Sequence, residues 1–346
     1  SLPEEAVKAA GADYYVLDDL PAEPSYMAVQ KLVDEFKASG ADLIVACGGG
    51  SVMDAAKLAS ILVTDEYGVK ELLDQPGRAK KCVPIILIPT TAGTGAEVTP
   101  NAIVAVPEKE LKVGIVSDAM IADNVLLDPL MIKNLPQKIA AATGVDALAH
   151  AIECYTSNKA NPISDTFALE ALDMILNNIL PACDSADAVS QKSAMQLASF
   201  YAGVAITASG TTAVHALSYP LGGKYHIAHG VSNAILLAPV MRFNAPACPE
   251  RFAAAYDRCV HRENLRDAGG KNGIYAALAG EDCPASGDTH KPFGIRCACV
   301  GSGDTGGGRH AGDTASEQQS APGDGGRRPR AVPPDPLTSE RTEKHE

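Results

Sequence analysis

Two residues in the middle of the chain, Asp146 and His150, have the types and the spacing that bind a metal ion. They lie four residues apart in a helical pattern, so both side chains project from one face, about one turn apart. Apolar residues continue the pattern around them and predict a buried helix. Because a buried carboxylate is costly unless it is paired or binds a metal, this face of the helix requires a partner.

Two histidines further along the chain, His215 and His229, supply such partners. One carboxylate and three imidazoles form a suitable ligand set for a catalytic divalent metal with one open position. Taken one at a time, these residues have simpler interpretations. An Asp and a His one turn apart more often form a structural hydrogen bond, and a lone His beside a glycine turn is usually a cap or a surface residue. The surrounding sequence has to decide between these interpretations.

A glycine turn in the first half of the chain has the pattern of a phosphate-binding element. The apolar run at residues 42–47 is short enough for a buried parallel strand and leads into Gly48–Ser51, then into a helical pattern over residues 52–62. Backbone N–H groups and the helix N-terminus can hold a pyrophosphate in such a unit. Alone the turn is weak evidence, since it lacks the G-x-G-x-x-G fingerprint. A second apolar run ends in Gly/Thr-rich residues 89–95, which suit hydrogen bonds to a nucleotide or simply cap a helix.

Four segments match, in order, the motifs of one known family, and on them the block from about residue 41 to 244 resembles the iron-containing (group III) alcohol dehydrogenases. These segments are Gly48–Lys57, Pro89–Thr99, Ala142–Glu153 and His229–Leu237. The resemblance implies an NAD or NADP cofactor and iron(II), although the ligand types also accept zinc, manganese or cobalt. It favours a metal site made of Asp146, His150, His215 and His229. It also implies dinucleotide contacts at Gly49, Gly50, Ser51, Asp54, Thr90, Thr91, Thr99, Asn101 and Lys112.

The proton-handling residue is expected near the third ligand, where Tyr219 and His226 lie. Many members of the family that this chain resembles place a His at the position of Tyr219. Tyr219 can replace it as a proton donor or can merely pack, and both interpretations stay open. Glu153 follows on the helix of Asp146 and His150, and we expect it on another face as a structural partner.

The resulting hypothesis is a metal-dependent NAD(P) alcohol dehydrogenase, or aldehyde reductase, that acts on a short-chain alcohol. The metal would act as a Lewis acid on the substrate oxygen, while hydride passes between the substrate carbon and the nicotinamide. One alternative is a non-catalytic remnant that binds metal or nucleotide only. A relative acting on polyol phosphates or a cyclising phosphate ester is a third candidate, but the segments around His150 and His215 offer only Lys224 to hold a substrate phosphate.

Composition excludes several classes of partner. The net charge of −13 repels phosphate backbones, so we expect no nucleic acid. The apolar runs are too short to span a bilayer. Nine cysteines without a C-x-x-C pair predict a reducing, cytoplasmic setting without a secretory leader. We expect a homo-oligomer whose only other partner is a small alcohol or aldehyde.

Strands alternate with helices in the first half, and helical patterns alone fill the second half, with breaks expected at residues 161–162, Pro181, Gly210 and residues 220–223. The fold class is therefore an α/β nucleotide-binding domain with a parallel sheet, followed by an all-helical metal-binding domain. We assign residues 1–133 to the first domain, 134–260 to the second and 261–346 to a low-complexity tail.

Both ends of the chain depart from the family pattern. A strand is predicted at residues 13–17, but we expect that the N-terminus is truncated and that the first strands of the nucleotide fold are missing. Residues 283–346 are rich in Gly, Pro and charge and hold few large apolar side chains, so we expect a disordered tail. Residues 317–329 resemble a family ending read in a shifted frame, and we infer that the C-terminus is out of frame.

Overall fold

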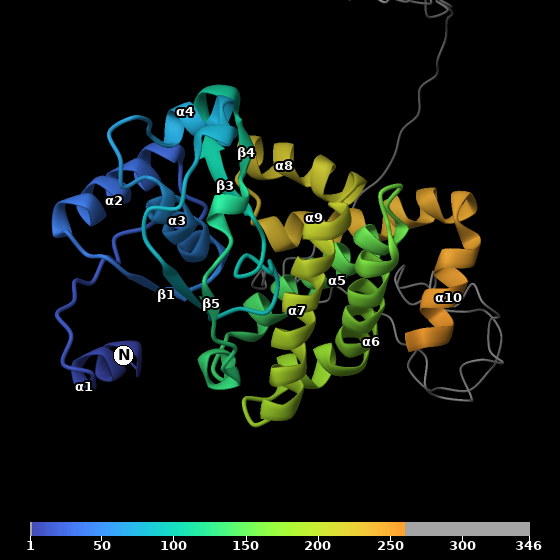
Figure 1. The fold of residues 1–346 in the computed structure, drawn as a ribbon. Coiled ribbons are helices and arrows are strands. Elements are labelled where there is room, and N and C mark those ends of the chain that lie inside the picture. The colour runs from blue at the N-terminus through green and yellow to red at the C-terminus, as the bar shows by residue number, and fades with distance from the viewer. Residues whose placement is uncertain (1, 260–346) are drawn as a thin grey trace, which may run out of the picture. The chain divides into compact units, whose positions relative to one another are not determined.

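The first half of the chain is built on a parallel sheet, as predicted. The computed structural model describes residues 2–259, all within one compact unit. Its sheet has the order β1-β2-β5, made of β1 (Ile44–Gly48), β2 (Ile85–Pro89) and the short β5 (Asn124–Val125) (Figure 1). The register pairs Ile44 with Ile85 and Leu87 with Val125. The tail predicted at residues 261–346, with its inferred shift of frame, lies outside the described residues.

Helices α1 (Leu2–Ala9), α2 (Tyr26–Ser39), α3 (Gly50–Ile61) and α4 (Val69–Asp74) belong to this half. Their ends follow local signals, and α2 is the clearest example. The side chain of Ser25 caps its first turn by accepting from the N–H of Ala28, and Gly40 ends it in the left-handed conformation at φ 67°. The spacing of Val29, Val33 and Phe36 buries one face of α2.

A buried lysine joins α3 to the loop after β2. Lys57 has no exposed surface, and its ammonium group lies 2.9 Å from Asp54 Oδ1 and 2.8 Å from the carbonyl oxygen of Ala96. It also donates to the carbonyl oxygen of Asn101. A buried charge persists only when it is paired and hydrogen-bonded, so these bonds fix the loop on α3. The antiparallel hairpin of β3 (Asn101–Val106) and β4 (Leu111–Val116) follows directly.

The second half is helical throughout the described residues, as predicted. It consists of α5 (Gln137–Thr156), α6 (Pro162–Asp184), α7 (Val189–Ser209), α8 (Ala213–Tyr225), α9 (His229–Asn244) and α10 (Pro249–Cys259). One apolar core holds them together, and α5 runs through it with every residue from 144 to 155 buried. The predicted breaks at residues 161–162 and at Gly210 are confirmed, at the start of α6 and the end of α7. Those at Pro181 and Pro220 are wrong, because these prolines lie inside α6 and α8. Packing against neighbouring helices outweighs the hydrogen bond that a proline removes.

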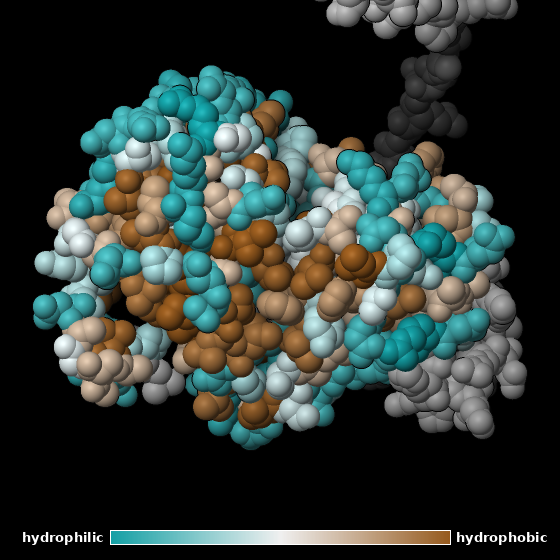
Figure 2. Space-filling view, in the orientation of Figure 1, coloured by the Kyte–Doolittle hydropathy of each residue, from teal (hydrophilic) through white to brown (hydrophobic). Residues whose placement is uncertain are grey.

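The strand predicted at residues 13–17 is also wrong. Residues 12–20 form no regular element, and the four apolar side chains Tyr14–Leu17 are 38% to 70% exposed. A strand is stabilised by backbone bonds to a neighbouring strand, and none of the described strands pairs with this segment. The local apolar pattern of residues 13–17 was therefore insufficient to form a strand. Figure 2 shows apolar side chains gathered over the region of β1 and β5, where Leu43, Val45 and Leu126 are exposed.

Glycines allow the two halves to pack closely. A Cβ at Gly95, in the loop after β2, would lie 2.7 Å from Gly203 Cα on α7. A Cβ at Gly223, on α8, would lie 2.3 Å from Leu111 Cα at the start of β4. Only glycine permits such approaches. The loop after β2 and the β3–β4 hairpin are thereby seated on the helical half.

Within residues 2–259, no single helix is long and apolar enough to cross a membrane, although α7 and α8 pass this test of length and composition as a pair bent by 104°.

Candidate metal centre and adjoining cleft

Four predicted ligands meet at one point in the helical half. Asp146 and His150 project from α5, His215 from α8, and His229 is the first residue of α9. One ligand atom of each residue lies within 4.8 Å of those of the other three. The Nε2 atoms of His215 and His229 lie 3.5 and 3.6 Å from Asp146 Oδ1. Helix α5 is buried, so it holds the first two ligands rigidly while α8 and α9 bring the others.

Outer hydrogen bonds orient two of the imidazoles. Nδ1 of His150 lies 3.2 Å from the carbonyl oxygen of Gly93, in the loop after β2. Nδ1 of His215 donates to the carboxylate of Glu153. With Nδ1 bonded outward, each ring turns Nε2 toward the centre, which is the arrangement of metal-binding histidines. The donor set and its outer partners therefore fit a divalent metal.

Glu153 lies on the same face of α5 as the ligands, so the expectation of another face is wrong. Positions 146, 150 and 153 follow the helical repeat of i, i+4 and i+7. The Glu153 side chain is fully buried, and its second oxygen accepts from Thr212 Oγ1 at 2.6 Å and from the N–H of Val214 at 2.7 Å. These bonds also fix the start of α8, and with it His215.

Asn233, which was not predicted from the sequence, lies one turn after His229 on α9 and has no exposed surface. Its Nδ2 lies 2.6 Å from Asp146 Oδ1, where it donates, and 3.1 and 3.2 Å from Nε2 of His215 and His229. Its Oδ1 is buried without a hydrogen-bond partner among the described residues. The spacing of i and i+4 from His229 was the signal for this residue.

The charges at the centre favour a cation. Burial alone would raise the pKa of Asp146, but the neighbouring histidines hold it well below its usual range, so the carboxylate is ionised. Burial lowers the pKa of His150 to about 4, which leaves this imidazole neutral and able to ligate. Burial opposes protonation of His215 too, but Asp146 and Glu153 raise its pKa to about 9. The two carboxylates thus attract one positive charge, which a metal can supply in place of the proton.

A cleft joins the metal centre to the glycine turn. Six predicted cofactor contacts line it together with ligands of the metal centre: Gly50, Ser51, Asp54, Thr99, Asn101 and Lys112. Three others, Gly49, Thr90 and Thr91, do not line it. Glu23 and Thr94 also line the cleft, and neither was predicted from the sequence.

The polar groups of this cleft differ in whether they already have partners within the protein. Asp54 is already bonded on both oxygens, to Lys57 and to the N–H of Ile103 at 2.9 Å. Lys112 forms an ion pair of 2.8 Å with Glu23. Gly50, by contrast, begins α3, where Gly49 provides no side-chain cap and the first N–H groups of a helix lack intrahelical acceptors. The turn at Gly50 is therefore the part of the cleft best able to hold a phosphate.

The structure separates the two predicted proton-handling residues. Tyr219 lines the cleft, and its ring stacks on His229 with centroids 6.2 Å apart. Burial, reinforced by the charges of nearby carboxylates, raises the pKa of Tyr219, so its hydroxyl stays protonated. His226 ends α8 in a left-handed conformation at φ 55°; it is exposed and does not line the cleft.

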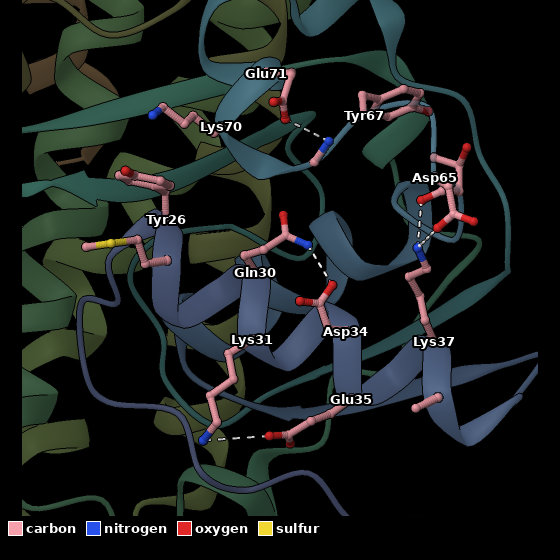
Figure 3. Close-up of a pocket in the computed structure, with 14 residues that line it drawn as sticks. Tyr26, Gln30, Lys31, Asp34, Glu35, Lys37, Asp65, Tyr67, Lys70 and Glu71 are labelled. Atoms are coloured by element: carbon pink, nitrogen blue, oxygen red, sulfur yellow. Dashed lines mark hydrogen bonds and ion pairs between the residues drawn. The ribbon is translucent and has the colours of Figure 1, made fainter.

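A separate surface groove lies beside α2 and α4 (Figure 3). Its charged side chains pair with each other, as in the ion pairs of Lys37 with Asp65 and of Lys31 with Glu35. None of its lining residues belongs to the metal centre or to the adjoining cleft. The groove therefore adds nothing to the chemistry of that site.

Comparison with known proteins agrees with this geometry. Two family models match the chain: iron-containing alcohol dehydrogenase over residues 3–129, and the C-terminal part of the Fe-containing alcohol dehydrogenase family over residues 140–278. The chain is 37% identical over 254 residues to long-chain-alcohol dehydrogenase 1 of Geobacillus thermodenitrificans, covering 72% of this chain and 64% of that protein. It is 32% identical over 278 residues to 1-propanol dehydrogenase of Citrobacter freundii, covering 79% and 72%.

Solved structures give the same result. An iron-containing alcohol dehydrogenase from Thermotoga maritima superposes with a TM-score of 0.70 at 32% identity, covering 82% of this chain and 76% of that one. The chain spans less than two thirds of the length of several relatives, 64% for the Geobacillus protein and 58% for a probable alcohol dehydrogenase of Escherichia coli. On these matches the chain belongs to the iron-containing alcohol dehydrogenase family.

Proposed function

We propose that this chain is a metal-dependent, NAD(P)-linked dehydrogenase that interconverts an alcohol and its aldehyde. The observation that carries this proposal is the single cleft that runs from the helix N-terminus at Gly50 to the four clustered ligands. A substrate there would lie next to both a cofactor and a metal. The relatives act on different alcohols and aldehydes by name, among them 1-propanol, 1,3-propanediol and sulfoacetaldehyde. Because the relatives also include a long-chain-alcohol dehydrogenase, their names support an alcohol or aldehyde as the substrate class, and the short chain is kept from the sequence analysis as part of the proposal.

The groups that would bind there have defined chemistry. A divalent metal, iron(II) by family membership, supplies Lewis acidity toward the substrate oxygen, and a bound nicotinamide exchanges hydride with the substrate carbon. Asp146, His150, His215 and His229 would hold the metal. Glu153 keeps the His215 ring in the orientation that turns Nε2 inward.

The remaining residues of the cleft bind, orient and handle protons. The N–H groups at Gly50 and the Ser51 side chain are suited to a pyrophosphate at the start of α3. Tyr219 keeps its phenolic proton, so it can donate a hydrogen bond to the substrate oxygen and release the proton during aldehyde reduction. His226 has no part in this proposal, because it lies outside the cleft. The cytoplasmic location and the homo-oligomer stay predictions.

The test combines metal analysis with turnover. Protein purified without oxygen should contain about one transition metal per chain, measured by mass spectrometry, and should oxidise short alcohols with NAD or NADP. Chelation should remove both the metal and the activity, and iron(II) or zinc should restore them. Metal and NADH binding without turnover of any alcohol would favour the non-catalytic alternative. Failure to bind either would contradict the proposal as a whole.

A further inference from the structure

Glu23 lines the cleft and contacts both the start of α3, at the glycine turn, and the metal ligand His229. The segment around it is fixed to the β3–β4 hairpin, because Ala105 donates its N–H to the carbonyl oxygen of Pro24 at 2.9 Å and forms a parallel bridge with Ser25. The backbone N–H of Glu23 donates to Ser51 Oγ at 3.1 Å, at the start of α3. Glu23 itself adopts a left-handed conformation at φ 52°, which is uncommon outside glycine.

The Glu23 carboxylate reaches across to helix α9, which carries the metal ligand His229. Its Oε1 accepts from the backbone N–H of His229 at 3.1 Å and pairs with Lys112 Nζ at 2.8 Å. His229 is the first residue of α9, and the preceding residue, Ala228, provides no side-chain cap. The first N–H groups of a helix need acceptors from elsewhere, and a negative charge there is favourable. Glu23 thus caps α9 from a distance of 206 residues along the chain.

Lys112 is held tightly in this arrangement. It is buried against α8, where a Cβ at Gly222 would lie 2.9 Å from both Cε and Nζ of the lysine. The ammonium group therefore has little room to move away from Glu23. Glu23 therefore connects helix α9, strand β4 and the start of α3.

We infer that Glu23 is a positioning residue that holds the metal ligand His229 and couples it to cofactor binding. The inference rests on the proposed function. Ser51 and Lys112 are the predicted cofactor contacts that Glu23 holds, so a cofactor that binds either one acts on the residue that caps α9. Such coupling is reciprocal: the cofactor changes metal affinity by the same factor as the metal changes cofactor affinity.

The test measures metal affinity by competition with a chelator, with and without NADH, using zinc as the probe. In the parent protein NADH should change zinc affinity by about fivefold or more. Glu23→Ala should weaken zinc binding about fivefold, the usual effect of losing a helix cap, and should abolish the NADH effect. Glu23→Gln keeps an oxygen acceptor for the N–H of His229 but loses the charge paired with Lys112. It should keep zinc affinity within about twofold and lose the NADH effect.

Glu108→Ala is the matched control, because this carboxylate accepts from Tyr26 and lies outside the cleft. It should match the parent protein in both measurements. Absence of an NADH effect in the parent, or an unchanged NADH effect in Glu23→Gln, overturns the inference even if Glu23→Ala does not fold. A parent protein that binds neither zinc nor NADH contradicts the proposed function instead, so the two failures are distinguishable.

Discussion

The metal centre and the glycine turn lie in one cleft but are built differently. The metal centre consists of side chains, each held by a buried partner, such as His215 by Glu153 and His150 by the carbonyl oxygen of Gly93. The turn at Gly50 offers backbone groups at a helix N-terminus and depends on the absence of a side chain. Substitutions that remove side-chain atoms should therefore impair the metal centre, whereas substitutions that add atoms should impair the glycine turn.

The two halves also differ in how completely they are buried. Helix α5 is buried over residues 144–155, within a core made of several helices. Among the described strands β1 pairs only with β2, and Leu43 and Val45, at its start, are exposed. The ligands on α5 are therefore held more rigidly than the strand that leads into the glycine turn.

The largest effect should follow loss of a ligand. His215→Ala or His229→Ala should remove most bound metal and abolish turnover, since the four ligands are proposed to share one ion. The loss of affinity should exceed the roughly 10- to 100-fold that removal of an outer partner causes. Metal content per chain, measured by mass spectrometry, checks this. His226→Ala is the control and should keep the metal; the opposite result for His226 and His229 would show that the ligand set is wrong.

Loss of the outer partner should come next. Glu153→Gln keeps the shape but replaces a charged acceptor with an amide that cannot accept from His215, Thr212 and Val214 equally well. Zinc affinity should fall roughly 10- to 100-fold, measured by chelator competition, with little change in NADH affinity. Glu170→Gln, at an exposed ion pair on α6, is the matched control. Unchanged zinc affinity in Glu153→Gln would remove Glu153 from the site.

The glycine turn should respond to added atoms. A Cβ at Gly50 would lie 2.9 Å from Thr94 Cγ2 and would crowd the approach to the helix N-terminus. Gly50→Val should weaken NADH binding about tenfold, on the scale of overpacking costs, while metal content stays unchanged. Calorimetry measures the affinity, and Gly77→Val, where a Cβ meets nothing within 4 Å, is the control. Equal NADH affinity in the variant and the parent would contradict a phosphate-binding role.

The smallest expected effect is on how the free energy of unfolding changes with pH. Glu97 is 2% exposed, and burial raises its pKa from 4.5 to about 7, with Lys57 opposing and Asp54 reinforcing the shift. The stabilising contribution of its neutral form is complete below pH 4.5 and is lost as the pH rises through about 7. Glu97→Gln should remove this loss, so its unfolding free energy should fall less than that of the parent between about pH 5 and pH 8.

The expected difference for Glu97→Gln is about 1–3 kcal/mol, measured by urea unfolding at both pH values. Glu66→Gln, at an exposed position, should behave like the parent. An identical pH dependence in Glu97→Gln and the parent would show that Glu97 stays ionised in the folded protein.

Local patterns in the sequence determined the elements and their order. The apolar run at residues 42–47 and the helical pattern over residues 52–62 predicted a strand and a helix, and the structure has β1 and α3 there. The change from alternating strands to helices predicted the parallel sheet followed by the helical half. The spacing of Asp146 and His150 placed both on one helix face, because the helical repeat is fixed by backbone geometry. The domain boundary at residues 133 and 134 stays a prediction.

Contacts between distant segments were decided only by the tertiary structure. The bond between Glu153 and His215, the approach of Asn233 to Asp146 and the cap that Glu23 provides for α9 join residues 62 to 206 positions apart. No periodicity records such pairs, because they depend on how whole helices pack. For the same reason the apolar segment Tyr14–Leu17 formed no strand: its pattern is local, whereas a strand exists only where another strand supplies the backbone partners.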